Sequence, residues 1–289
     1  VVQMSHLQYT AKSHHLQWDM KPLKQFCTLI YRQYSPKLLR ERHNIKLCKT
    51  KDSSILVLLF LQVELGIRSQ RKFYRMCQLF IGSSGLERTR FYRRAKYLLP
   101  LFKLIRQALT KRISKDELVI VDSFPLPVCL PVRNFKTRIF RDEQADISFN
   151  SAKQMWFYGF KVHMLVSLSG YVVNDLVTPA STHDSKACEE LLEDTNFPMI
   201  LADLGYTSQS LKQRLAQKGY QLWTPLRQNM SEAKHHNNWK LMAKRRTIET
   251  RFSVLCTEFD IQSPLVRSLC GLELWLESII WVYNLRFFN

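Results

Sequence analysis

The sequence predicts a basic all-α region followed by an α/β region, and three observations support this prediction. First, the pattern changes near residue 112, from apolar residues at helical spacing to alternating strands and helices. Second, the formal net charge of +19 is concentrated before this point. Third, two predicted strands end in acidic residues. The 289 residues suffice for two domains, and we place them at residues 1–112 and 113–289.

The first region is expected to be helical throughout. Its predicted helices cover residues 21–33, 36–48, 54–66, 69–81 and 86–108. The most apolar run, residues 55–66, is too short for a bilayer-spanning helix, which needs about 20 residues. We therefore expect a buried helix and no membrane partner. Residues 1–15 have no apolar stretch after their charges, so we also expect no secretory signal.

Charge separates the two regions more sharply than hydrophobicity does. Residues 1–112 contain 23 Lys and Arg against five acids, whereas residues 113–289 contain 20 against 19. Such asymmetry is typical of proteins that bind nucleic acid or an anionic membrane with one half. A hydrophobic share of 46% excludes a disordered polycation. Double-stranded DNA is the partner we predict.

Residues 69–96 have the outline of a helix-turn-helix. Two helical patterns flank a Gly-Ser-Ser-Gly turn at residues 82–85, and the second helix is strongly basic. An ordinary helical hairpin with a solvated basic face is the alternative. The candidate DNA-binding residues on the second helix are Arg88, Arg90, Arg93, Arg94 and Lys96.

The second region predicts a mixed five-stranded sheet flanked by helices. A turn at Ser169-Gly170 indicates a hairpin between the second and third strands. The predicted strands are residues 117–122, 154–170, 171–180, 199–206 and 219–226, and the predicted helices are residues 181–193, 208–218, 240–258 and 271–288.

Three acids of this region are candidates for one site. Asp122 and Asp203 close two predicted strands, and Glu249 lies on a helix. Because functional groups gather at the carboxyl ends of strands, we expect the three to converge. Carboxylates of this kind hold Mg²⁺, and two such ions support in-line phosphoryl transfer. The alternatives are a loop cap at Asp122, a turn residue at Asp203 and a surface pair of Glu249 with Arg245.

Four short motifs in order give the sequence a family resemblance. They are Val-Asp-Ser at 121–123, Pro-Ala-Ser-Thr-His-Asp-Ser at 179–185, Ala-Asp-Leu-Gly-Tyr at 202–206 and Arg-Arg-Thr-Ile-Glu-Thr-Arg-Phe at 245–252. With them, residues 115–288 resemble the DDE transposases of bacterial insertion sequences. The resemblance implies an RNase H-like catalytic domain, and a basic arm that binds the terminal inverted repeats of the element.

The resemblance also implies the chemistry and the partners. Asp122, Asp203 and Glu249 would be the catalytic and metal-binding residues for two Mg²⁺ or Mn²⁺ ions. Water would cleave the end phosphodiester, and the freed 3′-hydroxyl would then attack target DNA. Arg245 and Arg246 are expected to contact phosphate. Pairing two ends implies a homodimer on DNA, in the bacterial cytoplasm and associated with the nucleoid.

Two positions depart from the family pattern around Glu249. Many members have a Tyr seven residues before this Glu and a Lys seven after it, where this chain has Met242 and Cys256. The departure leaves the DNA-contacting role of the helix and the activity of this copy open. The remaining alternatives are a nuclease of the same fold and a non-catalytic DNA-binding protein or decayed transposase.

Several other residues have a structural and a functional interpretation. Asp184 could bind metal, but we favour a helix cap, with His183 in a supporting role. We expect the pair His235-His236 to be a solvated loop. We favour core or loop-anchor positions for Trp156, Trp223 and Trp239, although Trp239 is a candidate for stacking on a splayed base. Lys153 and Lys161 alternate with aromatic residues on a predicted strand, and they either follow a DNA backbone or lie on a solvated strand face.

The cysteines favour reduced thiols. There are seven, an odd number, and no two are close in sequence. We therefore expect neither a disulfide framework nor a zinc site.

Overall fold

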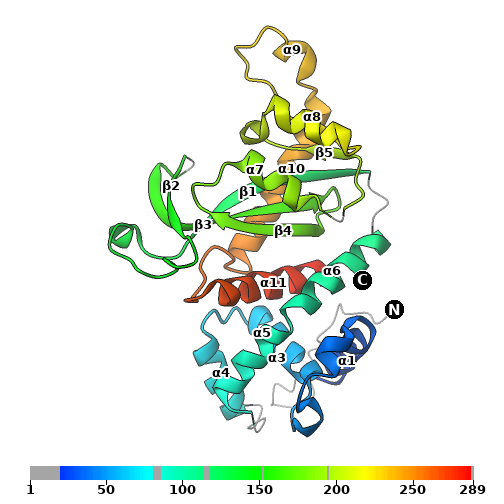
Figure 1. Ribbon diagram of the computed structural model, residues 1–289, viewed down its shortest axis with the longest axis vertical. Helices are drawn as coiled ribbons and strands as arrows, with labels where there is room; N and C mark the ends of the chain where they lie inside the picture. The colour runs from blue at the N-terminus through cyan, green and yellow to red at the C-terminus, as the bar shows by residue number, and fades with distance from the viewer. Residues whose placement is uncertain (1–19, 81–85, 114–116, 152, 194, 288–289) are drawn as a thin grey trace, which may run out of the picture. The chain divides into compact units, whose positions relative to one another are not determined.

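The computed structural model describes residues 20–80, 86–113, 117–151, 153–193 and 195–287. The chain divides into two compact units (Figure 1). Residues 1–108 and 270–289 form one, which we name the helical unit, and residues 109–269 form the other, the α/β unit. The boundary that the sequence predicts near residue 112 is close to residue 108, where the chain first passes from the helical unit to the α/β unit.

The helical unit contains α1 to α6 and α11. Residues 36–48 were predicted as one helix, and that prediction is wrong. The helix stops at Arg40, and Asn44 takes a left-handed conformation (φ 61°) that a right-handed helix does not accommodate. The elements are α1 Lys21–Tyr34, α2 Lys37–Arg40, η1 Ile45–Leu47, α3 Asp52–Glu64, α4 Gln70–Phe80, α5 Arg88–Tyr97, α6 Leu99–Ile113 and α11 Leu269–Leu285.

The last helix, α11, packs in the core of the helical unit, although the sequence pattern placed it with the α/β region. Its Trp281 ring lies 5.9 Å from that of Phe60 on α3 and 5.4 Å from that of Phe102 on α6, measured between ring centroids. Because α11 is buried almost all round, it needs helices on several sides. The apolar run around Phe60 is a buried helix, as predicted. No helix within the described ranges is long and apolar enough to cross a membrane.

Buried charges in the helical unit are paired. Asp52 accepts hydrogen bonds from Arg42 (2.8 Å), Arg94 (2.6 Å) and Tyr31 (3.0 Å). Burial raises the pKa of the Asp52 carboxyl, but the two arginines outweigh it, and its pKa lies below the ordinary value. A second buried pair joins Arg106 to Glu277 at 2.8 Å. Breaking a buried pair of this kind is strongly destabilising.

The α/β unit is built on a mixed sheet of six strands. Its strands are β1 Leu118–Pro127, β2 Asp146–Asn150, β3 Met155–Ser167, β4 Val172–Pro179, β5 Met199–Leu201 and β6 Gln221–Trp223. Its helices are η2 Pro131–Arg133, α7 Asp184–Leu191, η3 Leu204–Tyr206, α8 Gln209–Gln217, α9 Ala233–His236 and α10 Trp239–Thr257.

The sheet confirms the mixed α/β class and corrects the strand count. Its order is β2-β3-β1-β5-β6, and β4 also pairs with β3. The pairs of β3 with β1, β2 and β4 are antiparallel, whereas β1, β5 and β6 run parallel. Five strands were predicted, and the sixth is β2, a strand of five residues, Asp-Ile-Ser-Phe-Asn, that alternates polar and apolar side chains but is mostly half-buried.

Helices cover both faces of this sheet. On one face, Phe252 of α10 packs against Phe124 of β1, with ring centroids 5.0 Å apart. On the other, α7 contacts β3 and β4 (Figure 1). Successive side chains of a strand point to opposite faces. Asp122 therefore shares the α10 face with Phe124, whereas Ser123 faces α7.

Candidate active site

The two predicted aspartates lie at the same level of the sheet. The last pair between the parallel strands β1 and β5 joins Ile120 to Leu201. Asp122 and Asp203 each follow that pair by two residues. Asp203 comes after the end of β5, but β1 continues to Pro127, because its further residues pair with β3. Asp122 is thus inside its strand, not at its end as we predicted.

The guanidinium of Arg245 on α10 joins all three predicted acids. Its Nη2 lies 3.4 Å from Asp122 Oδ2 and 3.7 Å from Asp203 Oδ1, and its Nη1 lies 3.3 Å from Glu249 Oε1. The oxygens of the two aspartates are therefore no further apart than these first two distances together. The surface pair of Glu249 with Arg245, which we considered as an alternative, is one part of this larger arrangement.

The three acids have the chemistry of a divalent-metal site, but Arg245 lies between them. Carboxylate oxygens are the ligands that Mg²⁺ prefers. Within the described ranges, no three His, Cys, Asp or Glu side chains stand close enough to share an ion. The Arg245 side chain is only 14% exposed, and its Nε has no hydrogen-bond acceptor among the described residues. The acids thus surround a positive charge that is not fully satisfied there.

Asp122 is the buried member of the set. Its side chain is 17% exposed, against 46% for Asp203 and 60% for Glu249. Burial raises the pKa of the Asp122 carboxyl to about 6, against the lowering effect of the Ser123 amide and of Arg245. The nearby Asp203 and Asp184 add to the increase. A buried carboxylate with a raised pKa is a common feature of functional sites.

A fourth acid, Asp184, links the strand of Asp122 to the turn after Asp203. Its Oδ1 accepts hydrogen bonds from Ser123 Oγ (3.1 Å) and Lys161 Nζ (3.0 Å). A Cβ atom added at Gly205 would stand 2.7 Å from Asp184 Oδ2, so only glycine leaves room for this carboxylate. Asp184 therefore contacts β1 through Ser123, β3 through Lys161 and η3 through Gly205. The N-cap of α7 is His183, whose Nδ1 accepts from the Ser185 amide, and our preference for Asp184 as the cap was wrong.

Neutral polar groups complete the α7 side of the site. His163 is fully buried, and its Nδ1 lies 3.3 Å from the Tyr206 hydroxyl and 3.8 Å from Asp184 Oδ1. Burial lowers the pKa of His163 to about 4 although Asp184 opposes the change. Burial, and then the charge of Asp184, raise the pKa of Tyr206. Lys161 is thus the positive partner of Asp184, not a solvated residue of the strand face.

The basic residues of α5 differ in exposure. Arg88, Arg90 and Arg93 are exposed, and Lys96 is half-buried with its Nζ 4.7 Å from the centroid of the Tyr92 ring. Arg94 is buried and held by Asp52, so its guanidinium is already used inside the helical unit.

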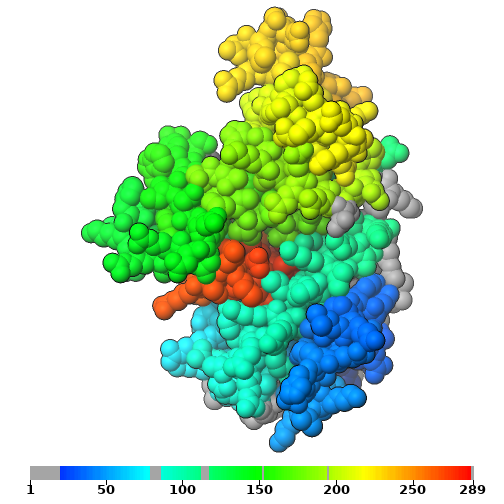
Figure 2. Space-filling model, in the orientation of Figure 1, coloured from blue at the N-terminus to red at the C-terminus, as the bar shows by residue number. Residues whose placement is uncertain are grey.

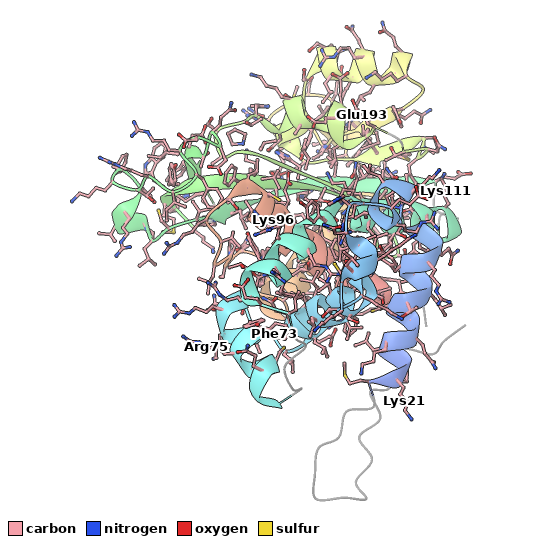
Figure 3. The ribbon with its side chains drawn as sticks, turned by 60° about the horizontal axis from the view of Figure 1, so that its bottom comes forward. Lys21, Phe73, Arg75, Lys96, Lys111 and Glu193 are labelled. Atoms are coloured by element: carbon pink, nitrogen blue, oxygen red, sulfur yellow. The ribbon has the colours of Figure 1, made fainter. Side chains whose placement is uncertain are left out.

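The two flanking helices of the predicted helix-turn-helix are present as α4 and α5. The predicted turn at residues 82–85 lies outside the described residues. Figure 3 labels Phe73 and Arg75 on α4 and Lys96 on α5. Phe73 is buried, whereas Arg75 is exposed and extends outward. The exposed charge of α4 was not among the predicted site residues, although its sequence is visibly basic.

The remaining predicted positions lie on or near α10. Arg246 is exposed, Met242 is at the edge of exposure at 36%, and Cys256 is half-buried. The pair His235-His236 is only partly solvated, because His236 stacks on Trp223 (5.8 Å between centroids) and hydrogen-bonds the Thr224 carbonyl at 2.9 Å. All seven cysteines are free.

Three carboxylates, one on β1, one just after β5 and one on α10, contact a single guanidinium and define a candidate site for phosphoryl transfer. The chain belongs to the family described as "Transposase DDE domain", which matches residues 112–268. The resemblance to DDE transposases is thereby confirmed. Among solved structures, the chain is similar to the cryo-EM structure of a piggyBac transposase synaptic complex with hairpin DNA. Identity is 12%, coverage is 91% of this chain and 76% of that chain, and the TM-score is 0.45. Comparison with curated proteins gave no match.

Proposed function

We propose that this transposase binds the terminal inverted repeats of a bacterial insertion sequence and cleaves and joins DNA at Asp122, Asp203 and Glu249. The observation that carries the proposal is the convergence of these three carboxylates on one guanidinium. Acids from two strands and a helix, distant in sequence, would repel one another without a cationic ligand. A site of this kind suits divalent cations and phosphate.

Asp122, Asp203 and Glu249 would together hold two Mg²⁺ or Mn²⁺ ions. When bound, such ions activate the attacking oxygen and stabilise the leaving one in phosphodiester cleavage. The part of the chain itself is to place the acids. Asp122 is fixed by its burial on β1, whereas Asp203 and Glu249 are more exposed and would be the acids that DNA reaches from solvent.

Arg245 has two roles in this proposal. Without metal it balances the three negative charges, at distances of 3.3 to 3.7 Å. If metal ions neutralised the three acids, the guanidinium would be free to donate to a DNA phosphate together with the exposed Arg246. Arginine suits both roles, because its planar fork matches carboxylate and phosphate equally well.

The helical unit would bind the DNA. Exposed Arg88, Arg90 and Arg93 and half-buried Lys96 line α5, and Arg75 adds charge from α4. We leave Arg94 out of this set because of its buried pair with Asp52. We further propose that the protein has an RNase H-like catalytic domain and acts as a homodimer on DNA, in the bacterial cytoplasm.

The test uses the element itself. The DNA flanking the gene is searched for short inverted repeats, and a labelled duplex of one end is incubated with protein and Mg²⁺. The wild type should nick the end, whereas Asp122→Asn, Asp203→Asn and Glu249→Gln should bind the duplex as tightly and leave it uncut. Glu232→Gln, which alters an exposed acid near the start of α9, is the matched control and should cut normally.

Two results would contradict the proposal, and each would favour a different function. Cutting that ignores the terminal sequence would indicate a nuclease of the same fold. Tight and specific binding without cutting in Mg²⁺ or Mn²⁺ would indicate a non-catalytic DNA-binding protein or a decayed transposase. The family departures at Met242 and Cys256 would then be the first positions to restore, by Met242→Tyr and Cys256→Lys.

A further inference from the structure

The hairpin of β2 and β3 carries aromatic rings on its surface. Phe149 and Trp156 stand opposite each other in the strand register, with ring centroids 5.4 Å apart. They are 44% and 56% exposed, and Phe135 in the preceding segment is 83% exposed. We expected Trp156 to be a core or loop anchor, and it is not buried. Figure 2 shows this part of the chain as the green protrusion of the α/β unit.

The rings are held on a packed support. Asn134 is buried and donates to the Trp156 carbonyl at 2.9 Å, which ties the segment before Phe135 to β3. Tyr158 donates to the Ile139 carbonyl at 2.9 Å. Nearby, the Phe140 ring is buried against Phe160, with centroids 5.3 Å apart. The aromatic surface is therefore ordered in advance, so a ligand that stacks on it loses less ordering entropy on binding.

Five exposed basic side chains lie in the segment before β2 and in the turn between β2 and β3, and none of them has an acidic partner among the described residues. The same part of the chain contains three acids, Asp142, Glu143 and Asp146, and the last two accept hydrogen bonds from other parts of the chain. Asp146 accepts from the Ser181 amide at 2.9 Å, and Glu143 accepts from the Leu269 amide at 3.4 Å. The exposed basic residues are Arg133, Lys136, Arg138, Arg141 and Lys153.

We propose that this surface binds unpaired nucleotides of a DNA strand, with bases stacked on Trp156 and Phe149 and phosphates held by these Lys and Arg side chains. Rings combined with cations are the usual composition of single-strand binding surfaces. Paired bases inside a duplex do not offer their faces for stacking. An apolar protein partner fits less well, because it would remove five unpartnered cations from water.

This inference rests on the proposed function for the source of the strand. Met164 of β3 pairs with Asp122 in the strand register. Trp156 lies eight residues before Met164, so it points to the same face of the sheet as Asp122, about 26 Å along the strand. A strand that is opened by cutting could therefore extend from the acids to the rings over a few nucleotides.

The experiment measures binding of a fluorescein-labelled 15-nucleotide oligothymidine, and of a blunt duplex of similar length, by anisotropy. The double variant Phe149→Ala/Trp156→Ala should bind the single strand at least about ten-fold more weakly. Its affinity for the duplex should change less than about two-fold. Leu265→Ala, which removes an apolar side chain that is 61% exposed elsewhere in the α/β unit, is the control and should bind both as the wild type does.

A second pair of variants distinguishes loss of the aromatic face from loss of folding. Trp156→Phe keeps an aromatic face and should retain most single-strand affinity, whereas Trp156→Leu keeps only apolar bulk and should lose it. Equal affinity of these two variants, or an unchanged double variant, would overturn the proposal. So would a double variant that no longer self-associates yet still binds the oligonucleotide, because the rings would then contact protein.

Failure of this inference can be distinguished from failure of the proposed function. Asp122→Asn should stop cutting and leave oligothymidine binding unchanged, since the rings lie on a different strand. Loss of cutting in the three acid variants with no effect of the ring variants on oligothymidine would reject only the single-strand surface.

Discussion

Replacing Asp122 with asparagine should stabilise the metal-free protein, because the native carboxylate is buried at a cost. Burial raises the pKa of Asp122 from 3.8 to about 6. A raised pKa means that the folded protein prefers the protonated, neutral form. Ionisation therefore weakens the fold, and this loss develops as the pH rises from about 4 to about 6. Asparagine has the shape of the neutral form and never ionises.

The size of the effect follows from the shift. Two pKa units at 1.36 kcal/mol each correspond to about 3 kcal/mol. This is an upper value, because Arg245 can move toward Asp203 and Glu249 in the variant. Above pH 6 we expect Asp122→Asn to be more stable than the wild type by about 1–3 kcal/mol, and the difference should vanish near pH 4.

Urea unfolding in EDTA at several pH values between 4 and 7.5 measures this difference. Asp142→Asn makes the same chemical change on an exposed residue and should leave stability nearly unchanged. Adding Mg²⁺ should then stabilise the wild type and not the Asp122 variant, since binding to the folded state alone raises stability. A variant that is equally stable or less stable than the wild type at pH 7.5 in EDTA would refute this reasoning.

The other predictions concern the partners of the site and of α5. Arg94→Ala should lower the free energy of unfolding by about 3–5 kcal/mol in chemical denaturation, because the buried Asp52 carboxylate would keep only one of its two arginine partners. Arg93→Ala should instead weaken DNA binding in a gel shift with no loss of stability. Arg245→Gln should tighten Mn²⁺ binding in calorimetry, since no guanidinium competes, yet slow DNA cutting; unchanged metal affinity would reject the competition. Gly205→Ala should slow cutting as much as Asp184→Asn, and the double variant should be no slower than either, whereas additive losses would show that Asp184 acts elsewhere.

The sequence predicted the class of fold and singled out three acids as candidates, because both leave local patterns. The change from helical spacing to alternating strands marks the α/β unit, and Asp122 and Asp203 follow apolar runs that become β1 and β5. The strand β2 was not predicted although its residues Asp-Ile-Ser-Phe-Asn alternate polar and apolar, because a run of five residues is a weak signal without its pairing to β3. The placement of α11 in the helical unit depends on contacts of Trp281 with helices about 180 to 220 residues earlier, which no local pattern records.

The details of the site were predicted less well. Arg245 was expected to meet phosphate or Glu249, but its contact with three acids depends on how α10 crosses the sheet. Asp184 has the sequence context of a helix cap, and its actual contacts with Ser123 and Lys161 involve two distant strands. Such convergent contacts are set by tertiary packing, so a single sequence does not reveal them.

Calorimetric titration of Mn²⁺ into the metal-free protein tests the central claim most directly. The claim is that Asp122, Asp203 and Glu249 form one divalent-metal site, now held together by Arg245. The wild type should bind Mn²⁺, and Asp122→Asn, Asp203→Asn and Glu249→Gln should each weaken binding at least about ten-fold, as the loss of one charged ligand does. Absence of Mn²⁺ binding to the folded wild type, or equal binding by all three variants, would contradict the account.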